Sequence, residues 1–125
     1  MVPSPRTTLE DMVRANARFS SAVRARDNYQ CRFERWVDGQ WVECGARSAL
    51  FAAHIYGRNW CGDAKFDPIV GITGCLADHD RYDGRRYDSV IVRVPPEREA
   101  LAYALITAAV TTFHIPRRLP PERGP

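Results

Sequence analysis

A tight turn between two cysteines constrains this chain more than any other sequence feature. Asp38-Gly39 is a strong signal for a two-residue type I′ turn, and it joins two Trp-Val segments. A hairpin closed by this turn places Trp36 opposite Trp41 on one face. The same register brings Cys31 and Cys44 together at the open end. The sequence therefore predicts a short antiparallel hairpin with a pair of thiols at its base.

The chain contains four cysteines, and their interpretation depends on the cellular compartment. The N-terminal residues lack the apolar core of a signal peptide, and no apolar run is long enough to span a bilayer. We therefore expect an intracellular, cytoplasmic protein without a membrane partner. In a reducing compartment, cysteines are better explained as metal ligands or free thiols than as disulfides.

A zinc knuckle is the structural site that these cysteines predict. Structural zinc takes four ligands, most often cysteine or histidine, and a carboxylate oxygen can also bind it. Cys31, Cys44 and Cys75 supply three ligands. Asp78 stands three residues after Cys75, where a Cys-x2-Cys pair would end, and Cys61 in the preceding segment is the other candidate. The sequence leaves Asp78 and Cys61 open as alternatives, beside the simpler possibility of unrelated buried thiols.

Length and composition predict one small domain. A chain of 125 residues with 45% hydrophobic residues has a small core, and a bound metal often stabilises such a domain. Lys65 is the only lysine, so arginine supplies the other basic residues. Arginine contacts phosphate in a bidentate manner, which suits nucleic acid, although genomic base composition explains the bias equally well. We expect a flexible tail over 1–7, a single domain over 8–113 and a basic, proline-rich tail over 114–125.

The remaining elements follow from spacing and turn residues. Thr8 with Asp11 resembles a capping box that begins a helix, and Pro95-Pro96 precedes an apolar helix. This last helix has apolar residues on more than one face, so it covers the core or packs against a second subunit in a homodimer. We interpret His114, which follows it, as structural. Helices are expected over 8–26, 75–82 and 97–113, a strand over 49–56, a long loop over 57–74, and a strand or helix extension over 87–94.

Several segments, in this order, resemble successive blocks of the HNH (His-Asn-His) endonuclease family. They are Arg26-Asp-Asn-Tyr-Gln-Cys31, Cys44-Gly45, Ala53-His54-Ile55, Val70-Gly-Ile-Thr-Gly-Cys75, and His79 with Tyr82-Asp83. The resemblance covers about residues 24–84. It implies an α+β fold with a ββα-metal (His-Me finger) core and a zinc knuckle, flanked here by an N-terminal and a C-terminal helix.

The resemblance also implies roles for individual residues in cutting DNA. His54 stands at the position of the general base, which takes a proton from the water that attacks the phosphodiester. His79 stands at the helix histidine that binds a divalent cation or contacts the scissile phosphate, and Asp83 at a further ligand for Mg²⁺ or Mn²⁺. The basic residues that flank this site and are expected to bind nucleic acid are Arg58, Arg81, Arg85 and Arg86.

Two positions depart from the family pattern. Ala53 stands where an Asp or His usually precedes the base, and Val70 aligns with the middle Asn. Asp67 substitutes for that Asn if the loop is shifted, and Asp78 or Asp80 are further candidates to support the site. The leading hypothesis is a metal-dependent DNA endonuclease of phage or mobile-element character. The alternative is a catalytically degenerate, zinc-stabilised nucleic-acid-binding module, and a protein–protein adaptor ranks last.

Overall fold

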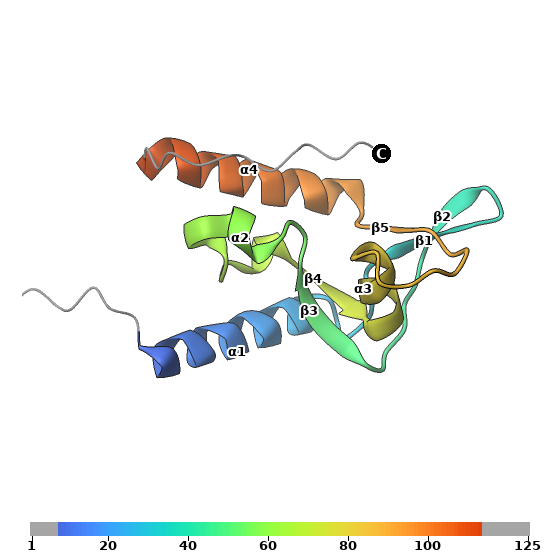
Figure 1. Ribbon diagram of the computed structural model, residues 1–125, viewed down its shortest axis with the longest axis horizontal. Coiled ribbons are helices and arrows are strands. Elements are labelled where there is room, and N and C mark those ends of the chain that lie inside the picture. Colours follow the sequence, from blue (N-terminus) through green and yellow to red (C-terminus); the bar gives the residue numbers. More distant parts are fainter. Residues whose placement is uncertain (1–7, 114–125) are drawn as a thin grey trace, which may run out of the picture.

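The computed structural model describes the backbone of residues 8–113 and the side chains of residues 8–108 (Figure 1). The expected tails over 1–7 and 114–125, including His114, lie outside the described residues. The fold is mixed α+β, as the sequence predicts. The elements are α1 (Leu9–Arg26), β1 (Glu34–Val37), β2 (Gln40–Glu43), β3 (Leu50–His54), α2 (Arg58–Cys61), η1 (Gly62–Ala64), η2 (Pro68–Val70), β4 (Gly71–Cys75), α3 (Leu76–Tyr82), β5 (Val92–Arg93) and α4 (Pro96–Phe113).

Helix α1 begins at the predicted capping box. Thr8 Oγ1 accepts a hydrogen bond from the backbone N–H of Asp11 at 3.1 Å, and the Asp11 carboxylate accepts one from Thr8 N. Phe19 and Val23 are the buried residues of this helix. Figure 1 shows α1 and α4 on opposite sides of the molecule, with β3 and β4 between them. No helix within the described range is both long and apolar enough to cross a membrane.

The hairpin of β1 and β2 has the predicted register. Trp36 pairs with Trp41 across the strands, and their rings meet edge to face with centroids 5.2 Å apart. Strand β5 pairs with the other edge of β1, which completes a three-stranded sheet in the order β2-β1-β5. Only Val92 and Arg93 of the segment expected over 87–94 are in a strand. The turn at Asp38-Gly39 has positive φ at both residues, as a type I′ turn requires.

The expectation of a continuous loop over 57–74 is wrong. Short helical turns occupy part of this segment, and β4 then pairs antiparallel with β3, from Leu50 opposite Cys75 to His54 opposite Gly71. The glycines of this segment suggested a loop, but Gly74 lies in a strand, where its lack of a side chain allows close packing. A Cβ atom on Gly74 would lie 2.5 Å from the Phe33 ring, so only glycine lets the strand approach this side chain.

Strands β3 and β4 and helix α3 follow one another as a ββα unit that positions the candidate site. Side chains alternate between the two faces of the strand pair. On one face, Thr73 Oγ1 donates a hydrogen bond to the carbonyl of Val23 in α1. On the other face, Gly74 lies against Phe33, whose ring also packs on Tyr82 of α3. The core is small and lies around these strands, and its largest fully buried apolar side chains are Tyr56, Phe33, Ile55, Ile72, Ile106, Val23, Val70 and Val94.

Candidate metal centre

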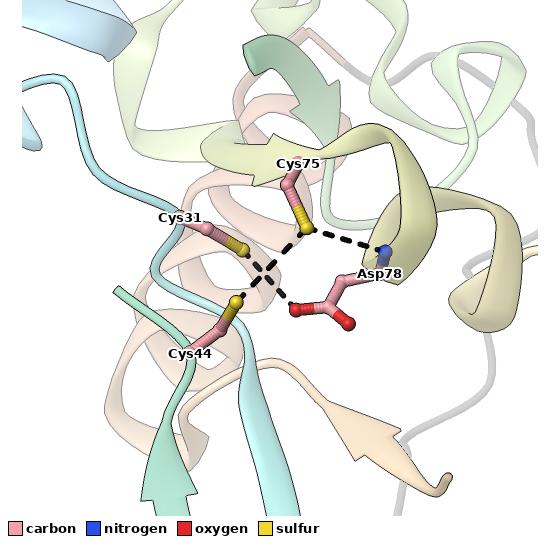
Figure 2. Close-up of side chains that lie close together, drawn as sticks. All are labelled: Cys31, Cys44, Cys75 and Asp78. Atoms are coloured by element: carbon pink, nitrogen blue, oxygen red, sulfur yellow. Dashed lines mark hydrogen bonds between the residues drawn. The ribbon is translucent and has the colours of Figure 1, made fainter. Parts of the chain in front are cut away.

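Three cysteines and one aspartate converge between the hairpin and helix α3. The sulfur atoms of Cys31, Cys44 and Cys75 and a carboxylate oxygen of Asp78 all lie within 4.8 Å of one another. Figure 2 shows Cys31 and Cys44 facing Cys75 and Asp78. In the described part of the chain, no other group of three or more His, Cys, Asp or Glu side chains is close enough to hold one ion. The predicted cysteine cluster is therefore present, and Asp78 is its fourth member.

Backbone hydrogen bonds place the two cysteines of the hairpin. Cys31 lies just before β1, and its carbonyl accepts a hydrogen bond from Gly45 N at 3.0 Å. Cys44 lies just after β2 and donates from its backbone N–H to the carbonyl of Phe33. The pairing thus continues past the ends of the strands and brings both thiols to the same edge. Cys75 ends β4 and caps α3, because its Sγ accepts the N–H of Asp78 at 3.4 Å.

The spacing of the four side chains fits a tetrahedral zinc ion. Zn–S bonds of about 2.3 Å and Zn–O bonds of about 2.0 Å place tetrahedral ligands roughly 3.5–3.8 Å apart. The Cys44 and Cys75 sulfur atoms are 4.0 Å apart, and Cys31 Sγ is 3.4 Å from Oδ2 of Asp78. Thiolate is a soft ligand and carboxylate is an accepted fourth one, so this donor set fits zinc better than it fits magnesium.

Asp78 is fully buried and is held by two arginines. Arg35 donates from Nε to Oδ1 at 3.0 Å, and Arg81 donates from Nη1 to the same oxygen at 2.7 Å. Burial alone would raise the pKa of Asp78, but hydrogen bonds from Cys44 and from these arginines more than offset it and hold the pKa below its usual value. The carboxylate is therefore ionised, and Oδ2 faces the sulfur atoms.

The same arginines balance the charge that a zinc centre of this composition carries. Three thiolates and one carboxylate around a dication leave a net charge of about −2, which is costly in a buried site. The guanidinium groups of Arg35 and Arg81 supply two positive charges, and Arg35 Nη2 lies 4.0 Å from Cys75 Sγ. Sequence reasoning did not identify Arg35 as part of this site, because nothing in a strand residue indicates which helix its side chain reaches.

Burial keeps the thiols of Cys31 and Cys44 protonated when no cation is present. It raises the pKa of Cys31 far above that of an exposed thiol, and it raises the pKa of Cys44 to about 11. A metal ion that binds here must displace these protons, so metal binding releases acid and becomes weaker as the pH falls.

Cys61 is not a member of the cluster. It lies in α2, where its Sγ is 3.7 Å from the carbonyl oxygen of Tyr56 and 3.6 Å from that of Gly57. Its side chain is fully buried. Of the two candidates that the sequence left open for the fourth ligand, the structure favours Asp78 and excludes Cys61 from the group.

His54, the candidate general base, lies at the end of β3. Its Nε2 is 2.8 Å from the carbonyl oxygen of Lys65, and its ring stacks on Phe19 with centroids 4.6 Å apart. A carbonyl only accepts, so Nε2 carries the hydrogen and Nδ1 keeps a free lone pair when the ring is neutral. Burial lowers the pKa of His54, and the positive charge of Arg58 lowers it further. The imidazole is therefore neutral at pH 7.

His79 and Asp83 lie one helical turn apart at the C-terminal end of α3. His79 Nε2 is 3.5 Å from an oxygen of Asp83, and the His79 ring stacks on Phe51 with centroids 6.3 Å apart. Phe51 and His54 are three residues apart on β3, so their side chains point to opposite faces of the strand. The structure thus pairs His79 with Asp83, whereas His54 packs on the face covered by α1.

The residues at the two departures from the family pattern have structural roles. Ala53 is buried and offers no ligand. Val70 is also buried, and its carbonyl accepts the backbone N–H of Ile55. The Asp67 carboxylate accepts the N–H of Ile69 at 3.0 Å and so caps the short turn η2. Asp80 contributes its carbonyl to a hydrogen bond from Arg85.

The four arginines expected to bind nucleic acid differ in their exposure and in their contacts with other side chains. The Arg81 side chain is only 9% exposed and is bound to Asp78 and Asp88, so we assign it to the metal centre. Arg86 also pairs with Asp88, at 2.8 Å. Arg85 is well exposed and lies 4.0 Å from Asp83. The guanidinium of Arg58 lies over the ring of Phe66, the residue that follows Lys65.

Comparison of the chain with models of protein families, with curated proteins and with solved structures gives no match.

Proposed function

We propose that this protein is an HNH-type endonuclease that hydrolyses DNA phosphodiester bonds. The observation that carries the proposal is the contact between His54 Nε2 and the carbonyl of Lys65, at 2.8 Å. This contact holds a neutral imidazole at the end of a strand with Nδ1 available to accept a proton. It occurs in a β3–β4–α3 unit, which is the order of elements that the resemblance to HNH endonucleases implies.

In the proposed reaction, Nδ1 of His54 takes a proton from a water molecule whose oxygen attacks the phosphorus atom. The bond from phosphorus to one sugar oxygen breaks, and that oxygen leaves with the electron pair and is protonated by solvent. His79 and Asp83 are the residues that would hold a Mg²⁺ or Mn²⁺ ion, which would stabilise negative charge on the phosphate and on the leaving oxygen.

Zinc in the cluster of Cys31, Cys44, Cys75 and Asp78 has a structural role in this proposal. The cluster joins the β1–β2 hairpin to the start of α3, the helix that carries His79 and Asp83. A metal ion there would add to the hold that Tyr82 gives α3, through its packing on Phe33 and its hydrogen bond to the Ile55 carbonyl. Because a displacement of about 1 Å in a catalytic group can cost on the order of a hundredfold in rate, fixing α3 matters for hydrolysis.

The second candidate function is a zinc-stabilised module that binds nucleic acid without cutting it. Two observations favour it. Ala53 and Val70 offer no polar group, and both are buried. His54 and the Phe51 ring that supports His79 also belong to opposite faces of β3, so a shared substrate must reach both around the end of the strand.

A nicking assay on supercoiled plasmid with Mg²⁺, Mn²⁺ or Ni²⁺ separates the two functions. We expect the wild-type chain to nick DNA and His54→Ala to lose about 10²–10⁴-fold in rate. His114→Ala is the matched control, because the proposal gives that histidine no part in catalysis. Binding of DNA without nicking in any of the three metals would establish the second function, and nicking that survives His54→Ala would exclude the mechanism.

A further inference from the structure

Two cations gather on a single aromatic ring close to His54. The guanidinium carbon of Arg58 lies 5.4 Å from the centre of the Phe66 ring, and the ammonium of Lys65 lies 5.3 Å from it. Neither cation forms an ion pair with a carboxylate in the part of the chain that the structure describes. Arg81 and Arg93, in contrast, are both bound to acidic side chains.

The two cations line one surface pocket. It has a volume of about 310 Å³ and is bounded by Arg58, Asn59, Gly62, Asp63 and Lys65. Asp63 is the one acidic side chain among these lining residues, so two positive charges face one negative charge. Like charges held close together repel one another, and an anion between them relieves that repulsion. The positively charged lining of the pocket is therefore suited to an anion.

The pocket is connected to the candidate general base through its own residues. The backbone carbonyl of Lys65 accepts the hydrogen bond from His54, while the side chain of the same residue lines the pocket. The charge of Arg58 reaches the His54 ring, since it contributes to lowering the pKa of that histidine. Lys65 thus joins the two, because its carbonyl contacts the imidazole while its side chain lines the pocket.

We propose that this pocket binds a backbone phosphate of the DNA, next to the bond at which His54 acts. The guanidinium of Arg58 is suited to contact two phosphate oxygens at once, and the ammonium of Lys65 to act as a point charge. The identity of the phosphate as part of DNA rests on the proposed function. The pocket itself, its charge and its link to His54 rest on the geometry alone.

The test measures DNA affinity and its salt dependence without any need for cleavage. A duplex oligonucleotide is titrated by fluorescence anisotropy against the His54→Ala chain, with and without Arg58→Gln and Lys65→Gln together. Each neutralised phosphate contributes about 0.9 to the slope of log affinity against log salt, and the pocket holds one phosphate, so we expect the slope to fall by about 1. Between roughly 50 and 200 mM salt, the double substitution should then reduce the loss of affinity about threefold.

The matched control removes the same charge elsewhere. Arg18→Gln with Arg47→Gln alters two exposed arginines that do not line the pocket, and it should leave the slope within experimental error of the parent chain. Thermal melting of all variants checks that each is folded. A pocket variant that melts like the parent but keeps its affinity and slope overturns the inference, and so does a parent chain that binds no DNA.

The outcomes for the pocket and for the nuclease proposal are distinguishable. Pocket-dependent binding in a wild-type chain that never nicks DNA supports the phosphate site and rejects the hydrolytic function. Nicking that is unaffected by the pocket substitutions supports the hydrolytic function and rejects the phosphate site. Titration with inorganic phosphate, followed by amide NMR shifts of Lys65 and Phe66, identifies the source of the anion. Saturation by free phosphate at least as tight as that by duplex overturns the assignment to DNA.

Discussion

Arg35 of strand β1 donates from its Nε to both carboxylate oxygens of Asp78 in helix α3, at 3.0 and 3.2 Å. The two residues are 43 positions apart in the sequence, and the contact joins the hairpin to the ββα unit. It leaves Oδ2 of Asp78 only 3.4 Å from Cys31 Sγ. The guanidinium therefore fixes the orientation of the one cluster member that is not a thiol.

Metal analysis should find about one zinc ion per chain. Cys44→Ser and Cys75→Ser should each lose that zinc and melt at a lower temperature, because structural zinc contributes directly to folding free energy. Cys61→Ser is the matched control, since Cys61 is buried but lies outside the cluster. It should keep one zinc. A folded wild-type chain without zinc would contradict this prediction.

Arg35→Gln should weaken zinc binding by about 10–100-fold, the usual effect of losing a residue that orients a ligand. The substitution removes a charge that balances the thiolates and frees the Asp78 carboxylate to turn. Competition with a chromophoric chelator measures the affinity. Arg93→Gln serves as the control, because Arg93 lies on the same sheet but pairs with Glu34. Equal affinities of the two variants would count against the orienting role.

His54 should titrate below the usual histidine pKa of about 6.5, because burial disfavours its charged form. Since the folded state holds this ring neutral, the unfolded chain binds more protons as the pH drops below about 6.5, and stability falls in that window. Histidine signals in an NMR titration measure the pKa. Any nicking activity should decline only below that lowered pKa, where the base becomes protonated.

Asp27 should make a large contribution to stability at neutral pH. It is fully buried, accepts the N–H of Thr73 at 2.8 Å, and pairs with Arg26 and Arg98. Burial alone would raise the pKa of Asp27, but these contacts hold it below its usual value. Because the folded pKa is depressed, the stabilisation is present above about pH 4 and is lost as the pH falls through the folded pKa.

Urea unfolding of Asp27→Asn tests this directly. We expect a loss of about 2 kcal/mol at pH 7, less than for a fully enclosed ion pair because both arginines reach solvent. The difference from wild type should shrink as the pH is lowered toward 3. Asp11→Asn, at the exposed start of α1, should cost much less. A constant difference across the pH range would show that the charge of Asp27 is not the cause.

Local signals in the sequence predicted the elements that depend on local chemistry. The capping box at Thr8 begins α1, and Asp38-Gly39 closes the hairpin in the register that pairs Trp36 with Trp41. The same register correctly predicted that Cys31 and Cys44 lie close together. Each of these features depends on residues within one turn or one hairpin, where spacing alone determines which groups meet.

Features that depend on distant contacts were harder to predict. The glycines of β4 indicated a loop because their close approach to Phe33 and to α1 is invisible in the sequence. The choice of Asp78 over Cys61 depends on where α3 lies against the hairpin. The pocket beside His54 was missed apart from Arg58, although Lys65, as the only lysine, was a signal worth following.

Cys75 has two tasks at once, because its Sγ caps α3 through Asp78 N and also belongs to the four-residue cluster. Damage to this one sulfur, by an oxidant or an alkylating agent, would therefore fray the first turn of the helix and dismantle the cluster in a single event. His79 lies in that helix and Asp83 caps its C-terminal end. Modification of the Cys75 thiol would therefore act on both side chains through the start of α3.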